Sequence, residues 1–194
     1  MLQPLIKCNQ TASGILLLAC GALCLLPGSE AKSRGLVIED AKVHNNNGVY
    51  QLSAVVDYEL TEPVREALTN GVALEFEMEI EILAERDYVW DSVFASVVQR
   101  FRLDYHELSR QYVVQNLNTR VTDTFPGLSA ALAHMGTVSN FPVIDSALLD
   151  PSGAYWGQLR VTLALDQLPL PIRARAYLSS AWRLGSDWYN WKLP

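Results

Sequence analysis

Beyond residue 24 the sequence has no cysteine. Its three cysteines, Cys8, Cys20 and Cys24, all lie in an N-terminal segment that is typical of an export signal. Removal of that segment would leave a working protein without disulfide bonds, thiol nucleophiles or thiolate metal ligands. Long apolar runs are also missing after this segment, whereas a membrane-spanning helix needs roughly 20 apolar residues.

Positive charge is scarce too. The chain has 15 Lys and Arg against 21 Asp and Glu, a net charge of −6. Nucleic acids and anionic membrane surfaces attract proteins through concentrated basic patches, so we expect neither as a partner that charge alone would recruit. The three histidines show no metal-ligand spacing, and we expect no structural metal and no cofactor.

The N-terminus predicts export. Lys7 precedes an apolar run over residues 14–26, which a Pro-Gly pair and the small residues Ser29 and Ala31 follow. This order predicts a signal peptide over residues 1–31, cleaved after Ala31, and hence a periplasmic protein. Two alternatives stay open: the signal remains uncleaved as a membrane anchor, or Cys20 carries a lipid.

The remaining residues, 32–194, predict a single domain rich in β-strand. Apolar and polar residues alternate in most of the segments that turn residues separate, the period of half-buried strands. We expect strands over residues 36–44, 49–60, 74–82, 95–105, 111–117, 141–144, 155–165 and 173–176. An Asn-Gly pair between the first two predicts a β-hairpin.

Two short helices complete the prediction. Thr61 and Pro63 open one, with the Thr61 side chain as a hydrogen-bond acceptor for the first turn, and Asn70-Gly71 closes it. The second begins near Thr124 and closes near Gly136. Many strands with few helices favour a mainly β fold, an antiparallel β-sandwich, with immunoglobulin-like topology as the first choice.

Several segments resemble a bacterial family that is catalogued as domain of unknown function 4390, over nearly the whole mature chain. The resemblance is carried by residues 67–72, the Glu-rich strand, Tyr88-Val89-Trp90-Asp91, residues 103–108, Gln111-Tyr112, Phe125-Pro126, residues 168–171 and the tail over residues 182–191. It implies export and a loose tie to envelope sensing. It implies no reaction, cofactor or site.

A row of glutamates is the first candidate for chemistry. Glu75, Glu77, Glu79 and Glu81 occupy one face of the strand over residues 74–82. Carboxylates bind divalent cations, but a calcium site needs oxygens at about 2.3–2.6 Å from the ion, which a flat strand alone does not supply. We therefore expect the row to pair with arginines of neighbouring strands: Arg100, Arg102, Arg160, Arg173 and Arg175.

Asp104 and His106 are the only pair that suggests catalysis, because they share a strand face two residues apart. No nucleophile-elbow sequence surrounds any serine, so a hydrolase that uses this pair is the least favoured alternative. We expect no catalytic residues and no enzyme activity.

The aromatic tail is the segment most open to a binding role, because tryptophan and tyrosine often anchor interfaces. The candidate binding residues are Trp90, Trp182, Trp188, Tyr189 and Trp191. The competing interpretation is that the tail folds back and covers a sheet edge.

We expect an exported binding or accessory module of the bacterial envelope, with an envelope or inner-membrane protein as its partner. A periplasmic binder of a small apolar or carbohydrate ligand is the alternative.

Overall fold

The computed structural model describes residues 34–85 and 92–193. Residues Lys32–Pro194 form one compact unit by themselves. The expected signal peptide and the candidate binding residue Trp90 lie outside the described residues.

Ten strands run through the described residues: β1 (Arg34–Asn46), β2 (Val49–Tyr58), β3 (Leu74–Ala84), β4 (Ser92–His106), β5 (Gln111–Asn116), β6 (Thr122–Phe125), β7 (Thr137–Asp145), β8 (Tyr155–Leu163), β9 (Leu184–Gly185) and β10 (Tyr189–Lys192). Three α-helices and three short 3-10 helices connect them: α1 (Glu62–Thr69), α2 (Leu128–Gly136), α3 (Leu170–Leu178), η1 (Ser146–Leu148), η2 (Leu165–Gln167) and η3 (Ser180–Trp182).

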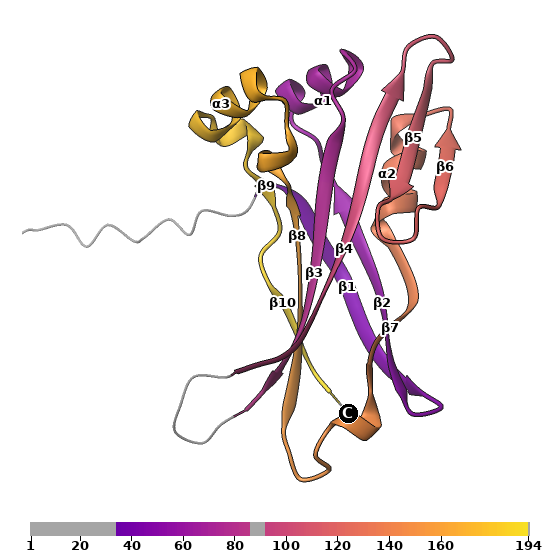
Figure 1. The fold of residues 1–194 in the computed structure, drawn as a ribbon, viewed down its shortest axis with the longest axis vertical. Helices are drawn as coiled ribbons and strands as arrows, with labels where there is room; N and C mark the ends of the chain where they lie inside the picture. The colour runs from indigo at the N-terminus through magenta and orange to yellow at the C-terminus, as the bar shows by residue number, and fades with distance from the viewer. Residues whose placement is uncertain (1–33, 86–91, 194) are drawn as a thin grey trace, which may run out of the picture. The chain divides into compact units, whose positions relative to one another are not determined.

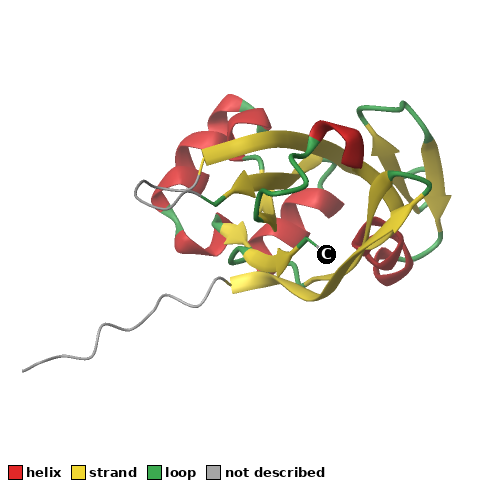
Figure 2. Ribbon diagram, turned by 90° about the horizontal axis from the view of Figure 1, so that it is seen from below, coloured by secondary structure: helices red, strands yellow, loops and turns green. Residues whose placement is uncertain are grey.

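All ten strands belong to one sheet in the order β6-β5-β4-β3-β8-β9-β1-β2-β7, with β10 paired to β8 (Figure 1). The sheet is mixed, because β1 and β9 run parallel while the other pairs are antiparallel. It curls around the core, as the view along the strands shows (Figure 2).

The mainly β prediction is therefore confirmed, whereas the purely antiparallel sandwich is not, and nothing in the strand order supports an immunoglobulin-like topology. Alternation along a strand fixes which residues face the core but not which strands become neighbours.

The strands with the strongest alternation form as expected. The β1–β2 hairpin turns at Asn47 and Gly48, which both have positive φ, at 52° and 88°. Strand β3 buries its apolar face fully and pairs antiparallel with β4 on one side and β8 on the other. The weak strand expected over residues 141–144 is the second half of the longer β7.

The segment over residues 173–176 is helix α3 rather than the expected strand. Pro171 stands in the first turn, where its missing N–H costs nothing, and alanine, arginine and leucine are all good helix formers. Over four residues, alternation cannot outweigh these preferences. Arg173 and Arg175 therefore lie on a helix and do not join the glutamate row of β3.

Helices α1 and α2 lie close to their expected positions. Val64 and Leu68 bury one face of α1, and Ala131 and Met135 bury one face of α2. The expected Thr61 cap is wrong: its side chain makes no capping bond and instead donates to the carbonyl of Ala181, 2.7 Å away. This bond ties the start of α1 to η3.

The core fills the concave side of the sheet. Its main cluster joins fully buried residues of distant strands, among them Leu52 of β2, Phe76 of β3 and Leu159 of β8. A smaller cluster of Ile82, Ile144 and Leu193 lies where β3 ends. The convex side of β3, β4 and β8 carries the polar residues, among them the glutamate row of β3 and its arginine partners.

Candidate functional site

The glutamate row of β3 is paired across the sheet, as the sequence predicts. Glu77 meets Arg100 of β4 at 2.8 Å and Glu79 meets Arg160 of β8 at 2.6 Å. Glu75 lies 3.9 Å from Arg102. Each arginine is a register neighbour of its glutamate. The carboxylates of Glu75, Glu77 and Glu79 therefore form a row of ion pairs, an ion-pair ladder, on the convex face.

Trp188 extends this ladder beyond β8. Its indole ring lies under the guanidinium of Arg160, with 4.3 Å from the guanidinium carbon to the ring centroid. Arg160 thus contacts Glu79 through one nitrogen while its guanidinium lies over the Trp188 ring. Such a stack holds both side chains against the sheet.

The other aromatic residues of the tail are distributed between the core and the sheet edge. Trp182 is buried in the main core cluster. Tyr189 and Trp191 stand in β10, opposite Leu159 and Gly157 of β8, and both pack against the core. The tail therefore contributes strands β9 and β10 to the sheet, and the four tail candidates lie in three different environments.

Asp104 and His106 are not drawn together into a pocket. The carboxylate of Asp104 pairs with Arg102 at 2.8 Å, and His106 is exposed at the end of β4. The convex face also has a polar hollow, and neither Asp104 nor His106 lines it.

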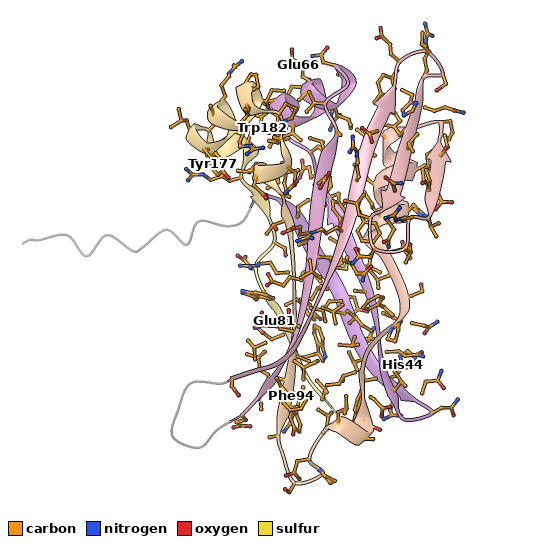
Figure 3. The ribbon with its side chains drawn as sticks, viewed as in Figure 1. His44, Glu66, Glu81, Phe94, Tyr177 and Trp182 are labelled. Atoms are coloured by element: carbon orange, nitrogen blue, oxygen red, sulfur yellow. The ribbon has the colours of Figure 1, made fainter. Side chains whose placement is uncertain are left out.

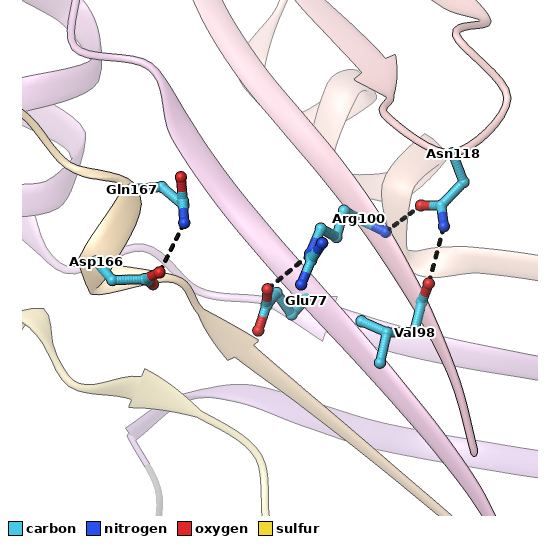
Figure 4. Close-up of polar contacts among 6 residues, drawn as sticks. All are labelled: Glu77, Val98, Arg100, Asn118, Asp166 and Gln167. Atoms are coloured by element: carbon cyan, nitrogen blue, oxygen red, sulfur yellow. Dashed lines mark hydrogen bonds and ion pairs between the residues drawn. The ribbon is translucent and has the colours of Figure 1, made fainter. Parts of the chain in front are cut away.

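That hollow lies where β3 and β4 meet the loop after β5. It has a volume of about 280 Å³ and is lined by Glu75, Arg100, Leu117, Asn118 and Gln167. Its polar groups already bond within the chain: Asn118 accepts from the Arg100 backbone N–H and donates to the Val98 carbonyl, at 2.7 and 2.9 Å (Figure 4). Little hydrogen-bonding capacity is left for a ligand.

The opposite end of the long strands carries an apolar surface, which we call the hairpin patch. It comprises Leu83, Val93, Phe94, Tyr155 and Trp156. Leu83 of β3 has Val93 of β4 and Trp156 of β8 as its register partners, so the three side chains share the convex face. Val93 is 54% exposed and Trp156 36%.

Phe94 extends the patch around the end of the sheet. The register between β3 and β4 shifts beside Leu83, and this bulge leaves Phe94 without an opposing residue. Phe94, labelled in Figure 3, is 46% exposed. Its ring meets Tyr155 edge-on, with 5.6 Å between ring centroids. The apolar surface therefore continues from the convex face onto the opening of the curled sheet.

A family model described as a domain of unknown function, DUF4390, matches residues 33–192. The chain belongs to the DUF4390 family. No curated protein and no solved structure matches this DUF4390 chain. The family predicted from the sequence is thus confirmed.

Sequence reasoning on this DUF4390 chain missed the hairpin patch, although a signal was present. Trp156 falls on the face of β8 that otherwise carries Gln158, Arg160 and Thr162. Leu83 likewise breaks the glutamate row of β3, whereas Val93 is in phase with the core-facing Ala95 and reaches the convex face only through the bulge at Phe94. An apolar residue out of phase on a polar face marks an exposed apolar position.

Among the residues that the structure describes, no helix is long and apolar enough to cross a membrane. Across the same ranges, 34–85 and 92–193, no group of three or more His, Cys, Asp or Glu side chains is placed to hold a metal ion.

Proposed function

We propose that this DUF4390 chain is an exported, non-enzymatic binding module of the bacterial envelope, and that it binds an envelope or inner-membrane protein through the hairpin patch. One observation carries the proposal: the patch places Val93, Phe94 and Trp156 on two strands that flank β3, all of them exposed. Contiguous exposed apolar groups of this kind are typical of interaction sites.

The composition of the hairpin patch suits a protein partner. Aromatic residues and apolar anchors dominate the energetically important centres of protein interfaces, and polar residues surround them. The register partner of Trp156 on β10 is the exposed Lys192. Two residues further along β8, Gln158 donates a hydrogen bond of 2.5 Å to Glu81 of β3. The apolar centre thus has a polar border.

Export is the second part of the proposal, and the leader pattern over residues 1–31 supports it. It is tested by isolating the protein from the periplasmic fraction and sequencing its N-terminus. A start at Lys32 is the expected result. A full-length protein in the cytoplasmic fraction would contradict export.

Binding is tested in living cells with a photo-crosslinking amino acid at position 93. The matched control carries the same probe at position 55, because Val55 of β2 is also an exposed valine of a strand, 44% exposed, but lies outside the patch. We expect one recurrent envelope protein to be joined to position 93 and not to position 55. The same adducts from both positions would contradict a specific surface.

A further inference from the structure

Helix α3 turns apolar side chains toward solvent. Leu178 is 89% exposed and Leu170 73%, while Ala176 is buried on the opposite side. Leu170, Ala174 and Leu178 follow each other at intervals of four residues, so they form one stripe along the helix. Tyr177, 51% exposed, lies beside the stripe. We call these four residues the α3 stripe.

Helix α1, which lies at the same end of the domain, has the usual amphipathic pattern of a surface helix. Its apolar residues Val64 and Leu68 are buried, and its exposed residues include Glu62, Arg65 and Glu66. A solvated helix is expected to look like α1. Helix α3 also buries Ala176 and packs Ile172 on the core, but unlike α1 it carries large apolar side chains on its outer face, and such exposed apolar groups are typical of interaction sites.

The charges on helix α3 itself are all positive, while the exposed Asp166 of η2, which packs on α3, is the nearest acidic residue along the chain. Helix α3 carries Arg173 and Arg175 and no acidic residue. Arg183 lies at the end of the helix, where its guanidinium donates to the carbonyl of Tyr177 at 3.2 Å. Arg175 and Arg183 are exposed, so a partner of the stripe is apolar and offers anionic groups at its border.

The α3 stripe protrudes from the end at which the described chain begins. Arg34, the first residue of β1, pairs with Leu184 of β9. Leu184 follows η3 by two residues, and η3 packs on α3. Figures 1 and 3 show α3 and Tyr177 at the end of the strands opposite Phe94. The fully exposed Leu108, in the turn between β4 and β5, lies at this same end.

Seven residues, 27–33, separate the apolar run over residues 14–26 from β1, and an extended chain of seven residues reaches roughly 23–25 Å at most. Until the expected cleavage after Ala31, this short link therefore holds the end that carries α3 near the inner membrane. This step rests on the export that is part of the proposed function.

We propose that the α3 stripe docks on the surface of a phospholipid bilayer. Leu170, Leu178 and Tyr177 enter the boundary between headgroups and acyl chains, and Arg175 and Arg183 bind lipid phosphates. Every phospholipid carries a phosphate, so Arg175 and Arg183 find anionic groups on a bilayer although the net charge of the chain is −6. A protruding helix suits a bilayer surface, because lipids can rearrange around it, whereas a folded protein partner would need a groove of matching shape.

The test uses the full chain with a benzophenone amino acid at position 178, mixed with vesicles of phosphatidylcholine and phosphatidylglycerol. After irradiation, lipid adducts are measured by mass spectrometry. The matched control has the probe at position 148, because Leu148 is an exposed leucine of η1 at the opposite end. We expect lipid adducts at position 178 and their absence at position 148.

Charge reversal separates docking from mere proximity to the vesicle. Arg175→Glu combined with Arg183→Glu should remove most of the adducts at position 178, whereas Lys42→Glu on exposed β1 should not. No lipid adduct at position 178, or equal adducts at both positions, would overturn the proposal. Adducts from position 178 to a protein, in cells, would also overturn it. Because the protein-binding test uses position 93, either proposal can fail without the other.

Discussion

The indole of Trp191 covers Gly157 so closely that no side chain fits at position 157. The two residues are register partners on β10 and β8, and a methyl group added at Gly157 would overlap the Trp191 ring. The glycine thus makes room for the aromatic tail on the concave side of the sheet. Overpacking of this kind usually costs about 1–3 kcal/mol.

Gly157→Ala is therefore expected to lower the free energy of unfolding by about 1–3 kcal/mol, measured by urea denaturation. The control is Gly127→Ser, because a Cβ at Gly127 meets open space and serine is favoured at the start of a helix, where Gly127 precedes α2. Equal losses in both variants would show that Trp191 does not pack on residue 157.

Tyr58 gives a pH-dependent prediction. Its ring packs edge-on against Phe76, with 5.3 Å between centroids, and its hydroxyl is buried with no hydrogen-bond partner in the described part of the chain. Burial raises the pKa of Tyr58 above its ordinary value of 10.0 because the phenolate would be desolvated.

Below pH 10 both the folded and the unfolded chain keep the Tyr58 proton. Above it the unfolded chain releases the proton while the folded chain retains it, so the free energy of unfolding falls as the pH rises. Tyr58→Phe should remove this part of the alkaline loss and leave the protein at least as stable at pH 7. Denaturation at pH 7 and pH 11 measures both values; an unchanged alkaline loss in the variant would contradict the assignment.

The stack of Arg160 on Trp188 should couple the two residues energetically. A double-mutant cycle with Arg160→Met and Trp188→Leu is expected to give a coupling free energy of about 0.5–1 kcal/mol. The comparison is a cycle on the more exposed Arg100–Glu77 pair, which lacks an aromatic partner and should lose its coupling in high salt. No coupling between Arg160 and Trp188 would mean that the stack adds nothing to stability.

Sequence patterns predicted the parts of this fold in which a long segment keeps one period. Strand β3 alternates from Leu74 to Ile82, and its glutamates pair with Arg100 and Arg160 because register neighbours on one face are close enough to meet. The same reasoning failed for α3, where four alternating residues competed with a proline in the first helical turn.

Strand order was beyond the reach of the sequence. The parallel pairing of β1 with β9 joins the two ends of the domain through only two register positions, Arg34 with Leu184 and Gly35 with Gly185. No local pattern encodes such a contact. The hairpin patch was missed for a related reason: Val93 and Trp156 lie more than 60 residues apart, and only their shared neighbour Leu83 brings them together.

The most direct test of the account compares crosslinking from position 93 in two versions of the protein. One keeps Trp156 and the other carries Trp156→Gln, with an unchanged melting temperature as the check that the fold is intact. We expect the envelope-protein adduct to form in the first and to be lost in the second. An adduct that persists without Trp156 would contradict binding through the hairpin patch.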